Sequence, residues 1–345
     1  MLDKSAIQFL PLGARRIAYE VRGDGPPLVA PAWWVSHLEL DWQDAGFRRF
    51  WQGVAQGHTL IRYDRLGVGM SDRTVREADL TLDGEVATLR ALLDELGLRR
   101  VTLFGGSSGS CTAIAFAAMH PERVDRLVLY GSYADGAAIT APEVAEAILA
   151  AVRAHWGLGA RMLSNMFLGG ADAASLDRFA RFQREAATAE TAADLLALVY
   201  RLDVREYLAR VEVPTLVVHR RDDRAIPYRL GREVAAGIPG ATFVPLPGSA
   251  HFPWHDDVDS VARACCQTPA APQPHDAGDE PPVLLSDRER EILACVARGL
   301  SDREIAEQLV LSPHTVHRHV ANIRTKLGRT TRTAAVAEAA RLGLL

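Results

Sequence analysis

The sequence predicts an α/β protein, with a doubly wound, mainly parallel sheet, a helical cap and a separate small all-α domain. Short apolar runs such as "TLIRYD", "VTLFG" and "PTLVVH" alternate with helical patterns through residues 1–267. This alternation is typical of parallel strands covered by helices. From about 132 to 210 the pattern is helical without a strand signal, as expected of a cap. Residues 283–345 carry repeated helix-start signals, which indicate the small helical domain.

Length and composition support this division. A chain of 345 residues exceeds one ordinary core. Residues 268–282, "TPAAPQPHDAGDEPP", have the composition of an extended linker. The formal net charge is −4, yet residues 281–345 carry ten Arg and Lys against seven Asp and Glu. A basic end on an acidic body indicates a nucleic-acid contact at that end.

Other classes are disfavoured. No apolar run is long enough to span a bilayer, and the N-terminus lacks a signal-peptide pattern, so we expect a cytoplasmic protein without a membrane partner. The three tail histidines have no Cys or acid beside them, and there is no G-x-x-x-x-G-K loop, so we expect neither a metal nor a cofactor. The cysteines show neither metal-ligand spacing nor a disulfide framework: Cys111, Cys265, Cys266 and Cys295.

A nucleophile is indicated by "VTLFGGSSGSCTAIAFAAMHPERV", residues 101–124. Gly105 to Gly109 match G-x-S-x-G between an apolar β-branched run and an Ala-rich helical run. The motif needs small flanks because its serine occupies a strained turn where strand and helix approach closely. Ser107 is therefore the predicted nucleophile for acyl transfer.

An acid and a base follow in the order that this motif requires. "VPTLVVHRRDDRAIP" ends a strand with Asp222 and Asp223, and "FVPLPGSAHFPWHDD" ends one with His251, then His255. From the residues alone, either carboxylate could orient the base. The base would take the serine proton while the acid fixes the imidazole tautomer.

These segments resemble the alpha/beta-hydrolase family over residues 17–263, together with "PERVDRLVLYGS" and "IRYDRLGVGMSDR". The resemblance implies Asp223 as the acid, with Asp222 as the alternative, and His251 as the base. It also implies oxyanion donors at the backbone N–H groups of Ser108 and Trp33. The family usually has His-Gly before the second donor, whereas this chain has Pro31-Ala32.

The expected activity of such a site is hydrolysis of ester or lactone bonds, although the sequence leaves open whether the triad turns over a substrate. "WWVSHLELDW" resembles hydrolase domains fused to cyclases and regulators. We expect the pocket around the serine to be lined by Trp34, His37, Met162, Met166 and Phe167.

The tail predicts a helix-turn-helix. "SDRE" occurs twice as a capping box, and "SPHT" places Pro313 at a first helical position. In the third helix a four-three-four spacing marks the buried stripe: Val316, Val320, Ile323 and Leu327. The opposite face is polar, cationic and free of carboxylates, as a helix entering the major groove of double-stranded DNA requires.

"LSDREREIL" and "GLSDREIAEQLVLSPHTVHRHVANIRTKLG" closely resemble the LuxR-type helix-turn-helix. We expect DNA contacts by His314, Thr315, His317, Arg318, Ala321, Arg324 or its neighbour Thr325, Lys326 and Arg332. His317 stands where the family usually has a basic residue. The last helix is apolar on one side, which predicts packing against a second copy in a homodimer through Val336, Ala339, Ala340 and Leu344.

Two functions follow from these patterns. The first is a transcriptional regulator whose hydrolase-like domain binds a small-molecule ligand; the sequence leaves open whether the domain also hydrolyses it. The alternative is a cytoplasmic serine hydrolase of esterase or lactonase type whose tail only assembles it. The carboxylate-free face of the third tail helix favours the regulator, because assembly does not require such a face.

Overall fold

The computed structural model describes residues 6–267 and 287–341, except for positions 310, 328 and 330. The chain forms two compact units, Met1–Pro274 and His275–Leu345, each with its own hydrophobic core. The predicted linker, residues 268–282, lies outside the described residues. Within the described part, no helix combines the length and apolar character needed to span a membrane.

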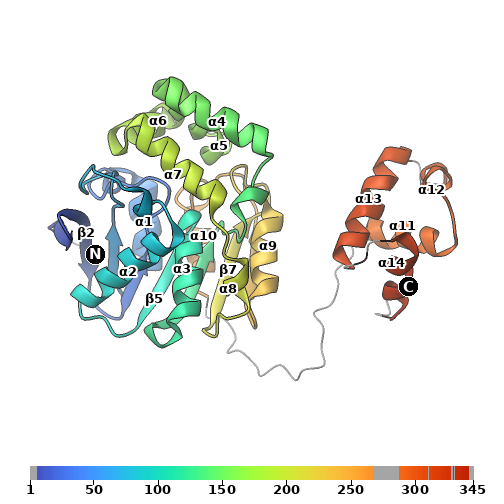
Figure 1. Ribbon diagram of the computed structural model, residues 1–345, viewed down its shortest axis with the longest axis horizontal. Coiled ribbons are helices and arrows are strands. Elements are labelled where there is room, and N and C mark those ends of the chain that lie inside the picture. The colour runs from blue at the N-terminus through green and yellow to red at the C-terminus, as the bar shows by residue number, and fades with distance from the viewer. Residues whose placement is uncertain (1–5, 268–286, 310, 328, 330, 342–345) are drawn as a thin grey trace. The chain divides into compact units, whose positions relative to one another are not determined.

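One eight-stranded sheet forms the centre of the first unit (Figure 1). Its strand order is β1-β2-β4-β3-β5-β6-β7-β8, antiparallel at the β1 and β2 edge and parallel from β4 onward. The central strands are almost wholly buried, which explains their continuous apolar runs. The strands are β1 Gln8–Leu12, β2 Arg15–Gly23, β3 Pro27–Ala30, β4 Thr59–Tyr63, β5 Val101–Gly106, β6 Val124–Tyr130, β7 Thr215–Arg220 and β8 Thr242–Leu246.

Helices cover both faces of this sheet. The chain moves from β3 to β4 through α1 and then reverses through α2, so right-handed crossovers place these helices on opposite faces. Helix α10 packs beside α1, and α3 packs beside α2. The helices are α1 Ala45–Val54, α2 Leu82–Glu95, α3 Ser108–Met119, α8 Arg205–Leu208, α9 Tyr228–Gly237 and α10 Val258–Cys265, with short 3-10 turns at η1 Asp41–Gln43, η2 Glu77–Asp79, η3 Pro121–Arg123 and η4 Gly136–Ala138.

The cap lies between β6 and β7, where the sequence predicts it, and covers one end of the sheet in Figure 1. It buries its apolar faces on the main core, with Leu163 and Leu196 almost inaccessible to solvent. Helix α5 packs against both of its chain neighbours, so the cap is a small bundle rather than a loop. Its helices are α4 Pro142–Ala154, α5 Trp156–Leu168, α6 Ala173–Ala186 and α7 Ala189–Arg201.

The second unit contains four helices in its described part: α11 Asp287–Ala297, α12 Asp302–Leu309, α13 Pro313–Lys326 and α14 Arg332–Arg341. Ser301 and Glu304 form the predicted capping box at the start of α12, and Ser312 caps α13. The predicted stripe of α13 is buried in the core of this unit: Val316, Val320, Ile323 and Leu327.

The predicted dimer face on the last helix requires a correction. Ala339 is fully buried in the core of its own unit, and Val336 packs partly against that core. Ala339 therefore already has apolar partners within the same chain and is not available to a second copy. Leu344 and the Ala340 side chain lie outside the described residues.

Candidate functional sites: a hydrolase-type triad and a DNA-binding helix

Ser107 occupies the turn between β5 and α3 with φ 49° and ψ −127°, one of two positive-φ residues other than glycine in the described chain. Such a conformation costs about 1–3 kcal/mol and persists only when its surroundings impose it. The flanking glycines allow the turn, because a Cβ on Gly109 would lie 2.7 Å from the Pro31 carbonyl oxygen. One on Gly105 would lie 2.7 Å from the Cα of Ser110. The strained, glycine-flanked turn is the one that the sequence motif predicts.

The structure brings Asp223 and His251 together. Asp223 Oδ2 lies 2.8 Å from His251 Nδ1, and both side chains are buried. Asp223 Oδ1 accepts hydrogen bonds from the backbone amides of Ala225 and Ile226 at 2.9 and 3.1 Å. Asp222, the alternative acid, is exposed to solvent. The backbone of the turn that follows Asp223 therefore orients its carboxylate. The other ring nitrogen of the base, His251 Nε2, has no hydrogen-bond partner among the described residues.

The loop carrying His251 is held from two sides. Arg220, buried at the end of β7, donates to the carbonyl of Ala250 at 2.8 Å. The His251 amide donates to the Phe167 carbonyl at the end of cap helix α5, at 2.7 Å. The cap is thus joined directly to the histidine loop, so a movement of α5 would also move the base.

Burial and charge set the ionisation of this pair. Burial alone would raise the pKa of Asp223, but the facing His251 ring and the backbone hydrogen bonds hold that pKa below its ordinary value. Burial lowers the pKa of the neighbouring His219, whose Nε2 lies 3.0 Å from the Ile226 carbonyl. The site therefore keeps an ionised carboxylate beside the imidazole, which an acid–base relay needs.

A buried arginine fixes the peptide that contains the candidate oxyanion donor. Arg65 donates to the Ala32 carbonyl at 2.9 Å and lies 3.5 Å from Ser108 Oγ. The Ala32 carbonyl and the Trp33 N–H belong to one trans peptide and point in opposite directions, so this bond directs the N–H away from Arg65. Glu85 offsets the charge with Oε2 at 3.0 Å. Arg65 orients this peptide although Pro31-Ala32 replaces the family's His-Gly.

A small cavity of about 30 Å³ contains both Ser107 and His251 in its wall. Of the five residues that we expected to line it, the structure places Trp34, Met166 and Phe167 there. His37 and Met162 are elsewhere. The His37 ring accepts from the amides of Glu39 and Leu40 in its own turn, and Met162 packs against the main core.

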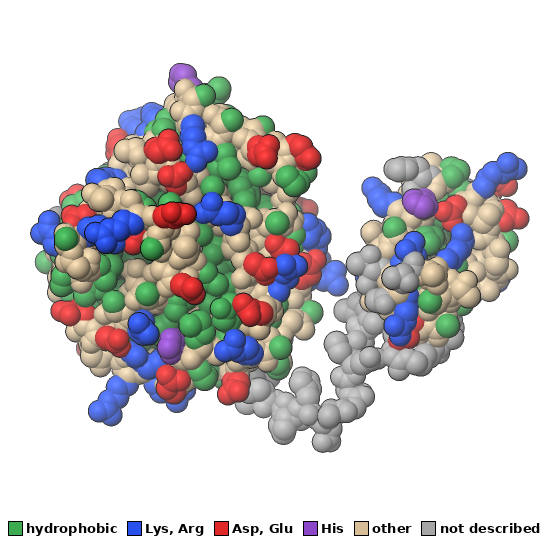
Figure 2. All heavy atoms as spheres, viewed as in Figure 1, with side chains coloured by type: hydrophobic (Ala, Val, Ile, Leu, Met, Phe, Trp, Pro, Cys, Tyr) green, Lys and Arg blue, Asp and Glu red, His purple; other side chains and the backbone are tan. Residues whose placement is uncertain are grey.

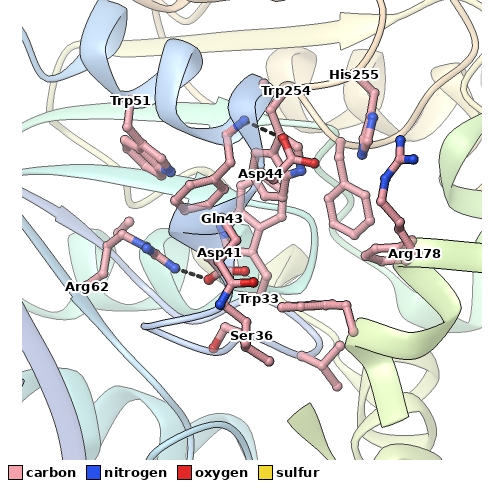
Figure 3. Close-up of a pocket in the computed structure, with 18 of the residues that line it drawn as sticks. Trp33, Ser36, Asp41, Gln43, Asp44, Trp51, Arg62, Arg178, Trp254 and His255 are labelled. Carbon is pink, nitrogen blue, oxygen red and sulfur yellow. Dashed lines mark hydrogen bonds and ion pairs between the residues drawn. The ribbon is translucent and has the colours of Figure 1, made fainter. Parts of the chain in front are cut away.

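A larger chamber of about 700 Å³ lies beside this cavity, between cap helix α6 and the η1–α1 segment (Figure 3). It is lined by Trp33 and Phe252, which also line the serine cavity, but not by Ser107. Burial lowers the pKa of His255, which lies at this chamber rather than at the triad.

In the second unit, α13 presents the polar face that the sequence predicts. Arg318, Ala321 and His317 are exposed, while Thr315 and Arg324 are half-buried. The His314 side chain lies outside the described part of this helix. Figure 2 shows Lys and Arg side chains on the visible face of this unit. The arrangement can present cations to the phosphates and base edges of a DNA groove.

Two predicted DNA contacts already have partners inside the unit. Lys326 Nζ lies 2.6 Å from the buried carboxylate of Glu289, and Arg332 lies 2.9 Å from Asp302. Asp302 also lies 3.3 Å from His317 Nδ1, so a carboxylate from α12 lies at the edge of the polar face of α13. Lys326 and Arg332 therefore have structural roles that the sequence analysis did not assign.

Fold and site together define a hydrolase-type α/β domain joined in one chain to a helix-turn-helix domain. The family model for the alpha/beta hydrolase fold matches residues 44–258, and that for bacterial regulatory proteins of the luxR family matches residues 283–339. The chain belongs to the alpha/beta hydrolase fold family and carries a C-terminal LuxR-family domain.

Known proteins resemble the first unit. A 2-hydroxy-6-oxononadienedioate/2-hydroxy-6-oxononatrienedioate hydrolase of Cupriavidus pinatubonensis is 32% identical over 198 residues, covering 54% of this chain and 68% of that protein. An esterase from Exiguobacterium antarcticum superposes with a TM-score of 0.66 at 18% identity, covering 75% of this chain and 97% of the esterase. An enol-lactonase from Burkholderia xenovorans superposes with a TM-score of 0.62 at 23% identity, covering 74% of this chain and 97% of the enol-lactonase. These two structures show the fold alone.

Sequence reasoning missed Arg65, Arg220 and the larger chamber. Arg65 stands inside "IRYDRLGVGMSDR" and Arg220 ends the apolar run "PTLVVHR". An arginine at or just beyond the end of a buried strand was a usable signal, since such a charge requires acceptors when it is buried. The chamber has no sequence signal, because its aromatic walls come from segments far apart in the chain.

Proposed function

We propose that this protein is a DNA-binding transcriptional regulator that acts in the cytoplasm and whose hydrolase-like domain binds a small-molecule ligand. The observation that carries the proposal is the pairing, in one chain, of a LuxR-family domain with an exposed cationic helix α13 and a hydrolase-fold domain with two cavities between cap and core. A ligand can change DNA binding only if it binds two arrangements of the protein with different affinity.

Double-stranded DNA is the proposed partner of α13, with Arg318 and His317 reaching base edges and Thr315, Ala321 and Arg324 beside them. A single helix-turn-helix contacts few base pairs, so we propose that two copies bind adjacent half-sites as a homodimer on DNA. The surface that joins them is not the face of α14 that is buried in the tail core.

We further propose that the first unit retains serine hydrolase chemistry on ester or lactone bonds. Ser107 Oγ attacks the acyl carbon, and His251 Nε2 accepts its proton and later gives that proton to the leaving oxygen. Asp223 holds the imidazole, and the amides of Trp33 and Ser108 stabilise the oxyanion. The strained Ser107 turn and the buried Asp223–His251 pair favour this second function, as do relatives that are named as hydrolases.

A fluorophosphonate probe tests the hydrolase chemistry, because it reacts only with an activated serine. We expect wild type to be labelled, and Ser107→Ala and His251→Ala to be labelled poorly. Ser110→Ala is the matched control, because Ser110 is a buried serine on α3 bonded to the Ser107 carbonyl. Labelling that persists in Ser107→Ala would remove the assignment.

DNA titration tests the regulator. Full-length protein and residues 283–345 are each titrated with promoter DNA, with and without a cell extract fraction of small metabolites. We expect both to bind with affinity that falls steeply with salt, and only full-length protein to respond to the metabolites. An identical response of both proteins would leave the hydrolase-like domain without a sensor role.

A further inference from the structure

The chamber beside the serine cavity has the size and walls of a ligand site. Its volume of about 700 Å³ lies in the range of cavities that hold small organic molecules. Aromatic rings from four segments form its walls: the loop after β3, helix α1, cap helix α6 and the segment after His251. The residues are Trp33, Phe47, Trp51, Phe179, Phe252 and Trp254. In Figure 3 the labelled aromatic and polar side chains converge on one space. Such walls favour a flat, largely apolar molecule.

This chamber is separated from the triad by an aromatic partition. The rings of Trp33 and Phe252 stack with centroids 5.8 Å apart and an interplanar angle of 18°. Trp254 packs on the chamber side, 4.9 Å from Trp33 and 5.0 Å from Phe252. Gly106 leaves room for this partition, because a Cβ there would overlap the Trp33 indole. A molecule in the chamber therefore lies beside Ser107 without contacting it.

Charged side chains of both signs line the chamber. Three arginines, Arg62, Arg178 and Arg181, face three carboxylates, Asp41, Asp44 and Glu185. Arg62 is ion-paired with Asp41, and the Asp44 side chain caps α1 by accepting from Phe47. The charged groups of the inner wall are thus already engaged with one another or with the backbone, which favours an uncharged occupant there.

Two buried donors at the inner wall lack an acceptor. Trp51 Nε1 and the Tyr63 hydroxyl make no hydrogen bond that satisfies their protons within the described chain, although these residues are only 1% and 2% exposed. In Figure 3 the indole nitrogen of Trp51 is on the side of the ring that faces the other drawn residues. Buried donors are normally satisfied by protein or by ordered water, so these two donors offer hydrogen bonds to an acceptor that enters the chamber.

We propose that this chamber, rather than the cavity at Ser107, holds the regulatory ligand, and that the ligand is an uncharged, flat molecule whose carbonyl oxygen accepts a hydrogen bond from Trp51 or Tyr63. The inference rests on the proposed regulator function, because it names the ligand class of that sensor. Cap helix α6 and core helix α1 both line the chamber, so a ligand there would contact the cap and the core together. The serine cavity of about 30 Å³ is too small for such a molecule.

Three probes with one ring system test the proposal by calorimetric titration of the full chain: methyl naphthyl ketone, ethylnaphthalene and naphthoate. We expect the ketone to bind about fivefold more tightly than ethylnaphthalene, as one neutral hydrogen bond allows, and naphthoate to bind more weakly than the ketone. The double variant Trp51→Phe, Tyr63→Phe should lose the preference for the ketone and keep the binding of ethylnaphthalene. Ala45→Trp, at an exposed position of the lining, should weaken all three.

The matched control is Trp156→Phe, Tyr207→Phe, which makes the same changes outside the chamber and should keep the preference. Ser107→Ala should bind all probes like wild type. The proposal is overturned if no probe binds, if ketone and ethylnaphthalene bind equally, if naphthoate binds best, or if Ser107→Ala alters the affinities. These titrations contain no DNA, so their failure is distinct from failure of the DNA titration that tests the regulator.

Discussion

At the scale of residues, one arginine connects the buried core to the peptide of the proposed oxyanion donor. Arg65 reaches the carbonyl of the peptide that supplies the Trp33 N–H, and its charge is offset by Glu85 in a pair that is 4% and 6% exposed. Burial raises the pKa of Glu85, and the facing Arg65 opposes this rise. The pair is expensive to break from one side only, because that leaves a buried charge without a partner.

Arg65→Met should therefore lower the free energy of unfolding by about 3–5 kcal/mol, measured by urea denaturation. Adding Glu85→Leu should recover most of that loss, because a well-packed apolar pair can replace a buried ion pair. The rate of fluorophosphonate labelling should stay low in the double variant, since the Ala32 carbonyl still lacks its donor. Recovery of labelling together with stability would show that Arg65 serves only the fold.

Asp41 gives a second prediction at this scale, through pH. Burial raises its pKa to about 7, although Arg62 opposes the rise. In the unfolded chain the Asp41 carboxyl has its ordinary pKa of 3.8 and releases its proton above that pH, whereas in the folded protein it keeps the proton up to about pH 7. The stability that this group contributes is therefore full at low pH and is lost as the pH rises toward 7. We expect the free energy of unfolding of wild type, relative to Asp41→Asn, to fall between about pH 4 and 7. A difference that is constant with pH would contradict this.

At the scale of elements, α13 combines a buried stripe with an exposed cationic face. Arg318 is exposed on that face and, by its position, is suited to reach a base edge. Arg318→Ala should weaken specific DNA binding by about 1–3 kcal/mol and relax the preference at one base pair, measured by competition with mutated sites. Arg303→Ala on α12 is the control, since it also removes an exposed arginine from this unit. Equal effects of both changes would mean that only overall charge matters.

Lys326 at the end of the same helix should behave differently. Its ammonium group is 2.6 Å from Glu289, whose side chain is 6% exposed, so Lys326→Ala leaves a buried carboxylate without this partner. We expect both a lower melting temperature of the isolated tail and weaker binding to all DNA sequences alike. Lys326→Arg should restore much of both. An unchanged melting temperature would assign Lys326 to phosphate contact alone.

At the scale of the whole molecule, the described residues form two separate hydrophobic cores, one in each unit, with no residue in common. Cooperative unfolding requires shared packing, so differential scanning calorimetry of the full chain should give two transitions. Each should match the transition of its own fragment, residues 1–267 or 283–345. A single transition that neither fragment reproduces would show that the units stabilise one another.

The sequence by itself determined the two domains, the cap between β6 and β7, the Ser107 turn and the buried stripe of α13. These features depend on local periodicity, capping and turn chemistry, which neighbouring residues encode. For the acid that would orient His251, the sequence left two adjacent candidates, Asp222 and Asp223. The tertiary structure places Asp223 against His251 and leaves Asp222 exposed, because only the Asp223 side chain turns inward.

Only the tertiary structure decided the rest, since it depends on residues that are distant in the chain. Arg65 meets Ala32, Lys326 meets Glu289, and the chamber forms where α1, α6 and the segment after His251 converge. The prediction that His37 lines the serine cavity was wrong. Its ring accepts hydrogen bonds from the backbone amides of its own turn, and the sequence of this aromatic-rich segment does not reveal such a local bond. Ala339 was wrongly offered to a second copy because an apolar helix face does not specify whether its partner lies in the same chain.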